Sequence, residues 1–139
     1  MRLAVRAALA MVLALTGCAT AQVQSRWSRL EGCWVETTTE QPRAFLNWSA
    51  DGAGGWRGEW RITAGNPDVD DAVDFTLTPE GDGMRLCQHR EHVADECAPA
   101  FPSAAGAKDG DWVFEIEHER LAFGIIGREG LFFLGRRCG

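Results

Sequence analysis

The sequence predicts an all-β fold, namely a small antiparallel up-and-down β-barrel of about eight strands. Short segments in which apolar and polar residues alternate recur after residue 30, and Gly, Pro, Asn and Asp separate them at regular intervals. No segment of useful length in this part of the chain has the 3.6-residue period of a helix. Closure of such a meander into a barrel removes the unpaired edges that a lone sheet would expose.

The alternation is clearest in two segments, WRGEWRIT at 56–63 and AVDFTLT at 72–78. Glycine-rich or proline-containing turns follow at 50–54, 65–68, 79–83 and 127–130. The longest irregular stretch is expected at 93–110. The expected strands are 30–37, 44–49, 56–63, 72–78, 84–92, 111–117, 119–126 and 131–137.

Size and charge limit the classes of function. A chain of 139 residues holds one domain, and its apolar fraction of 45% is too high for a disordered protein. A net charge of −6 argues against a nucleic-acid partner, because such proteins need a basic face to neutralise phosphates.

The N-terminus has the layout of a signal peptide: basic residues, an apolar run from Ala7 to Leu15, then small residues. The run is too short for a membrane-spanning helix, which needs roughly 20 apolar residues. Its end, Leu15-Thr16-Gly17-Cys18, resembles the lipobox of bacterial lipoproteins. The resemblance implies cleavage before Cys18, acylation of that cysteine and a lipid anchor in the bilayer. Ordinary secretion with a chance cysteine is the alternative.

We therefore expect a signal peptide at 1–17, a lipidated cysteine with a polar tether at 18–29 and a barrel domain at 30–139. Ala19 follows the cysteine, where lipoproteins retained in the inner membrane often carry Asp. This similarity implies the outer membrane, with the domain in the periplasm.

Four cysteines remain, which suggests two disulfides in an oxidising compartment. Three pairings are conceivable. We favour Cys87–Cys97, which closes a short local loop, and Cys33–Cys138, which joins the two ends of the folded region. The alternative is a zinc site, because Cys87 and Cys97 enclose His89 and His92, although this spacing matches no standard zinc motif.

Gly32-x-Trp34 at the start of the first expected strand resembles the G-x-W signature of lipocalins and their calycin relatives. The resemblance implies that Trp34 plugs one end of the barrel and that a basic residue of the last strand, here Arg137, packs over the indole. If Trp34 and Arg137 face inward, Cys33 and Cys138 face outward on neighbouring strands. The wider stretch 30–62 is similar to bacterial lipocalin-like domains of unknown function.

The inward-facing aromatic residues suggest either a filled core or a cavity that binds a small hydrophobic ligand. Trp27 and Trp48 are candidates for the surface, and Phe132 and Leu134 are expected to point outward. The candidate cavity residues are Trp56, Trp60, Phe75, Trp112, Phe114 and Phe123.

We identify no catalytic residue, cofactor or metal site in the sequence. His89 and His92 lie three apart on an expected strand, so they point to opposite faces. The acidic residues Asp68, Asp70 and Asp71 are interpreted as a polar turn, because the glycine and terminal glutamate of a calcium-binding EF-hand loop do not follow.

The leading hypothesis is a lipid-anchored, non-enzymatic binder of a small hydrophobic molecule. The alternative is an envelope protein-interaction module, such as an inhibitor of a secreted hydrolase. Periplasmic lysozyme inhibitors are also small disulfide-bonded barrels on lipoprotein anchors, and an acidic turn at 65–72 or 79–83 could enter the cleft of a basic lysozyme.

Overall fold

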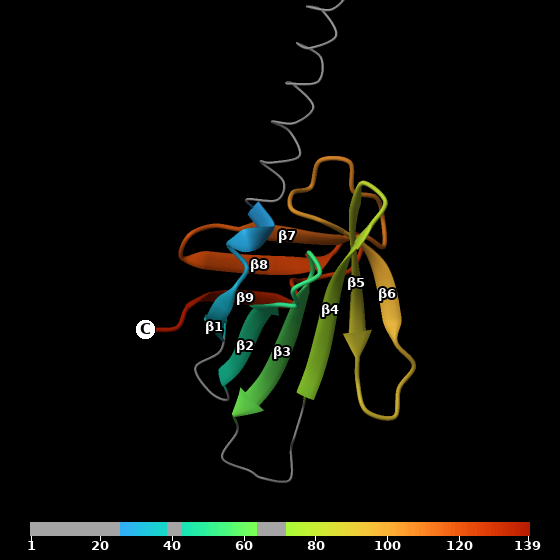
Figure 1. Cartoon of the computed structure of the whole chain (residues 1–139). Coiled ribbons are helices and arrows are strands. Elements are labelled where there is room, and N and C mark those ends of the chain that lie inside the picture. Colours follow the sequence, from blue (N-terminus) through green and yellow to red (C-terminus); the bar gives the residue numbers. More distant parts are fainter. Residues whose placement is uncertain (1–25, 39–42, 64–71) are drawn as a thin grey trace, which may run out of the picture.

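The chain folds as a closed β-barrel whose strands follow one another around the ring in chain order (Figure 1). The computed structural model describes residues 26–38, 43–63 and 72–139. Cys18, the signal peptide, the three aspartates at 68–71 and almost all of the turn at 65–72 lie outside these ranges. The strands are β1 (Gly32–Glu36), β2 (Arg43–Ala50), β3 (Trp56–Thr63), β4 (Ala72–Glu80), β5 (Gly83–His89), β6 (Glu96–Phe101), β7 (Trp112–Ile116), β8 (Arg120–Ile125) and β9 (Phe133–Arg137).

The described residues form nine strands, one more than the eight segments expected from the sequence. The missed strand is β6, which lies inside the stretch expected to be irregular. Its sequence, ECAPAF, lacks strong β-formers and contains Pro99, and both features argue against a strand. Pairing with β5 along Glu96–Ala100 stabilises it.

The barrel is not antiparallel throughout, because a ring with an odd number of strands cannot alternate direction at every step. The closure between β1 and β9 is antiparallel, so one other pair must be parallel. That pair is β6 and β7, which match only at Ala100↔Trp112 and Phe101↔Val113. This short parallel contact is called the β6–β7 seam below.

One end of the barrel is plugged from within. A helical turn at 26–28 precedes β1 and buries Trp27, which is 2% exposed, together with Leu30. The indole N–H of Trp34 donates to the carbonyl of Leu30 at 2.8 Å. Trp27 is thus a core residue rather than a surface one, and the compact fold begins within the segment expected to be a tether.

Arg137 joins three segments at this plugged end. Its guanidinium carbon lies 3.9 Å from the centroid of the Trp34 ring. The same group donates to the carbonyls of Arg29 at 2.6 Å, of His118 at 3.2 Å and of Glu31. Cys33 and Cys138 form a disulfide on the outer side of the same strand pair, which confirms the favoured pairing.

Trp48 is also buried, at 1% exposure, and was wrongly considered for the surface. Its ring lies against Gly58 on β3, where a Cβ atom would meet ring carbons at 2.9 Å. A glycine at this position therefore makes room for a large ring in the core.

No helix in the described part of the chain is long and apolar enough to cross a membrane.

The Arg137→Lys substitution should lower the free energy of unfolding by about 2 kcal/mol. Lysine keeps the charge, but it cannot donate to three carbonyls while its cation covers an indole ring. Urea denaturation measures the change. Arg136→Lys, on the exposed neighbouring residue, is the matched control, and equal stability of the two variants would contradict the role given to Arg137.

The turn between β2 and β3 depends on Asp51. Its carboxylate accepts from the backbone N–H groups of Ala53 at 2.7 Å and Gly55 at 2.9 Å. These hydrogen bonds lower the pKa of Asp51 below its ordinary value of 3.8, because they favour the ionised form.

Asp51→Ala should therefore lower the Tm at neutral pH. A carboxylate with a lowered pKa stabilises the folded state fully above pH 3.8, the ordinary pKa of the group. This stabilisation disappears as the pH falls through the lowered pKa. Thermal unfolding from pH 7 to pH 2 should show the Tm difference shrinking in the most acidic samples. A difference that stays constant over this range, or one matched by Asp82→Ala in the β4–β5 turn, would refute the proposed cause.

Candidate functional site

The six aromatic residues proposed as a cavity lining largely fill the barrel interior. Phe114 and Phe123 stack with ring centroids 4.7 Å apart, and Phe75 meets Phe123 edge-on at 5.8 Å. Trp56 lies beside Trp27 at 6.4 Å, at the plugged end. Trp60 is partly buried against the core. Of the six, Trp112 lines the groove described next.

A groove of about 520 Å³, called the mouth groove below, lies at the opposite end of the barrel from Trp34 and Arg137. Its walls come from the last residues of β5 and β8, the first residues of β6 and β7, and the two connections at 90–95 and 126–132. Because β5 runs away from the plugged end, these strand termini meet at the other mouth. The β6–β7 seam forms part of the opening.

The floor of the mouth groove is apolar and its rim is charged. Trp112, Ile125 and Phe132 form the floor. Val93, in the connection at 90–95, and Leu131, in the connection at 126–132, also line the groove. They are 59% and 56% exposed and are the large hydrophobic side chains that the described residues leave exposed. The polar lining residues are Gln88, Arg90, Glu96, Arg128 and Glu129, whose charges balance.

Phe132 points toward this groove rather than outward as expected. Its ring lies 5.4 Å from Phe75, 5.8 Å from Trp112 and 6.1 Å from Trp60. Alternation does not apply to Phe132, because β9 begins only at Phe133 and Phe132 lies in the bend that precedes the strand. Val93 and Leu131 were missed for different reasons. Val93 is an isolated apolar residue in a polar connection, where periodicity gives no signal. Leu131 begins the apolar run at 131–134 and was assigned to the last strand, although it lies in the connection before β9.

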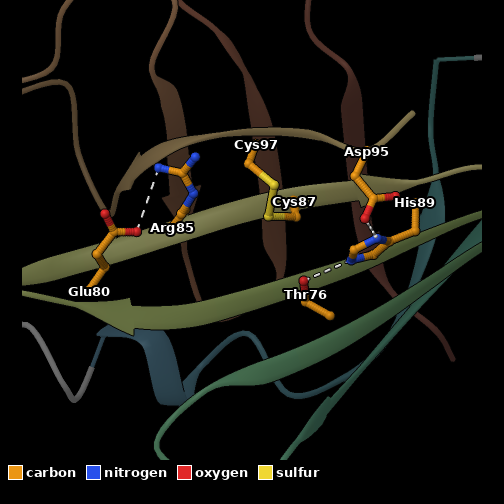
Figure 2. The surroundings of a disulfide bond; sticks show 7 residues. All are labelled: Thr76, Glu80, Arg85, Cys87, His89, Asp95 and Cys97. Carbon is orange, nitrogen blue, oxygen red and sulfur yellow. Dashed lines mark hydrogen bonds and ion pairs between the residues drawn. A yellow bond between two sulfur atoms is a disulfide. The ribbon is translucent and has the colours of Figure 1, made fainter. Parts of the chain in front are cut away.

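The outer face of β4, β5 and β6 holds one wall of the groove in place (Figure 2). Cys87 and Cys97 form the second expected disulfide between directly paired residues. Next to it, His89 Nδ1 lies 2.9 Å from the carboxylate of Asp95, and its Nε2 lies 2.9 Å from the hydroxyl of Thr76. These contacts tie the connection at 90–95 to β4 and β5, so the wall on this side is fixed.

The zinc site considered from the sequence would need the thiols of Cys87 and Cys97, and both sulfur atoms are joined in the disulfide. His92 does not take part in the contacts of His89. Its side chain is 88% exposed and pairs only with its neighbour Glu91 in the described residues. Within the described ranges, His, Cys, Asp and Glu side chains form no group of three or more that could hold a metal ion.

Comparison with known proteins gave no match to a family model, a curated protein or a solved structure.

Proposed function

We propose that this protein is a lipid-anchored, non-enzymatic lipoprotein that binds a small hydrophobic ligand in the mouth groove. The observation that carries the proposal is the convergence of Val93 and Leu131 on a floor of Trp112 and Phe132. Exposed apolar side chains gathered around a concave site are typical of binding surfaces. A volume of about 520 Å³ lies in the range of small-molecule sites.

The anchor in this proposal is Cys18, acylated after removal of residues 1–17. The lipobox-like sequence supports it, and the two disulfides of the barrel fit an oxidising compartment such as the periplasm. The domain would hang from the outer membrane, since its acidic charge disfavours close contact with anionic lipid head groups.

A calycin-like ancestry is part of the same proposal. Gly32, Trp34 and Arg137 make the contact that the lipocalin resemblance implies, and the first and last strands pair as such a barrel requires. The extra strand and the parallel β6–β7 pair depart from a simple up-and-down meander. This departure supports a ligand site in the mouth groove and not deep inside the barrel.

The alternative is an envelope protein-interaction module, and the acidic turn between β4 and β5 favours it. Glu80 and Asp82 border a second groove of about 320 Å³. This groove lies where β5 begins and β6 ends, at the opposite end of these strands from the connection at 90–95. Lysozyme assayed with the purified domain separates the two proposals. If the domain fully inhibits lysozyme, and the double variant Glu80→Gln with Asp82→Asn does not, the result favours the inhibitor.

Replacing both Val93 and Leu131 by Ser should weaken binding of the probe 1-anilinonaphthalene-8-sulfonate about tenfold, because two apolar contacts are lost. Fluorescence titration of the mature chain with Cys18→Ser measures the affinity. Leu134→Ser, on the outer face of β9, is the matched control and should bind the probe like the parent. An equal loss in the control and the double variant would show that the probe binds elsewhere.

Cys18→Ser should abolish incorporation of a palmitate analogue and release the chain from the membrane fraction. The physical reason is that several acyl chains anchor far more strongly than one, and all of them depend on this cysteine in the proposal. Metabolic labelling of the producing cells checks it, with Thr20→Ser as the control. Labelling that persists in C18S would exclude this residue as the site.

A further inference from the structure

Strand β6 has an edge that the barrel leaves largely unpaired. It pairs with β5 along five positions, from Glu96 to Ala100, but with β7 only at Ala100 and Phe101. Figure 1 shows β6 at the right of the barrel, with its upper end near β7 and the orange connection arching upward from that end. The first half of β6 therefore has a strand neighbour on one side within the described part of the chain.

Two observations show which backbone groups face this open side. Cys97 lies opposite Cys87 with a Cα–Cα distance of 4.0 Å, which is typical of the narrow pairs in an antiparallel ladder that exchange no hydrogen bonds. Pro99, two residues further on, has no N–H to give to β5. Both indicate that the N–H and C=O of Cys97 point away from β5, toward the seam.

This free edge borders the mouth groove. Ala94 and Glu96, which directly precede Cys97 in the chain, line the groove together with Trp112 on the other side of the seam. A neighbouring strand would lie about 4.8 Å from β6. One side of the groove thus offers backbone hydrogen bonds, and its floor offers contact to an apolar side chain.

We propose that the mouth groove takes an extended peptide segment, which adds to β6 as a short strand and places one apolar side chain on Trp112 and Phe132. The inference rests on the proposed binding role of the groove and names the class of its ligand. An acyl chain could cover the apolar floor, but it could not pair with both the N–H and the C=O of Cys97. Addition of a strand satisfies both groups, and alternate side chains of the peptide supply specificity.

The rim and the length of the edge define this peptide further. Arg90 and Arg128 are offset by Glu96 and Glu129, so the rim favours a segment without strong net charge. Pro99 ends the run of available N–H groups, so the added strand spans only three or four residues. A bulky apolar residue flanked by small polar β-formers fits these limits.

The test uses the full mature chain with Cys18→Ser and two probe peptides. The first is acetyl-TVTFT-amide, and the second is the same peptide methylated on the backbone nitrogens of its Val and Phe. Both peptides carry the same side chains, but the methylated one cannot donate from the edge that carries the Val and Phe N–H groups. Its Thr N–H groups lie on the other edge, and pairing through them would turn the Phe side chain away from Trp112. We expect the parent peptide to bind at least about tenfold more tightly, since the loss of backbone hydrogen bonds costs that much. NMR should show slower exchange of the Cys97 amide when the parent peptide is bound.

The outcomes separate this inference from the proposed function. Equal affinity of the two peptides, or binding of 1-anilinonaphthalene-8-sulfonate without binding of the parent peptide, would overturn strand addition and leave the groove as a site for small hydrophobic molecules. Failure of both peptides and of that probe would overturn both proposals. Loss of peptide binding in the variant with Val93→Ser and Leu131→Ser, with normal binding in Leu134→Ser, would place the peptide in the mouth groove.

Discussion

A closed ring of nine strands must contain a parallel step, and the open part of the wall of this barrel lies at that step. The step falls between β6 and β7, where only two positions are paired. On the N-terminal side of Ala100, β6 has no pairing with β7. The wall of the barrel is therefore open there, and the mouth groove lies in the opening. The same separation leaves the edge of β6 without a second partner. The Cys87–Cys97 disulfide and the His89 contacts to Thr76 and Asp95 hold this strand on its paired side.

The two ends of the barrel have different roles. At one end, Arg137 covers the indole of Trp34 and binds backbone carbonyls of the preceding loop, while the Cys33–Cys138 disulfide joins the same two strands outside. Residue 26 enters the fold at this plugged end, beside the helical turn. In the proposed anchoring through Cys18, the mouth groove would lie at the end of the barrel opposite the one at which residue 26 enters.

The sequence predicted two parts of the fold: the strands marked by alternating apolar and polar residues, and the face of the strand on which each of their residues lies. Eight strands follow from alternating segments, and the inward phase of Trp34 and Arg137 led to the correct Cys33–Cys138 pairing. The sequence could not show β6, since Pro99 and two alanines give no strand signal and the strand depends on its pairing with β5. Nor could it locate the groove: Val93 and Leu131 lie in connections, and Phe132 lies in a bend, where position depends on how distant strands meet. Alternation placed the aromatic residues inside the barrel and left a filled core and a cavity both open, because periodicity reports which side a residue faces and not whether space is left there. In the structure these residues largely form a packed core.

The open seam is tested most directly by amide hydrogen exchange along β6 in the free mature chain, measured by NMR. We expect the Ala98 amide, which faces β5, to exchange slowly, and the Cys97 amide to exchange rapidly although it lies within a strand. Protection of Cys97 equal to that of Ala98 would mean that the edge is already paired, and it would contradict the open seam on which the mouth groove and its peptide ligand depend.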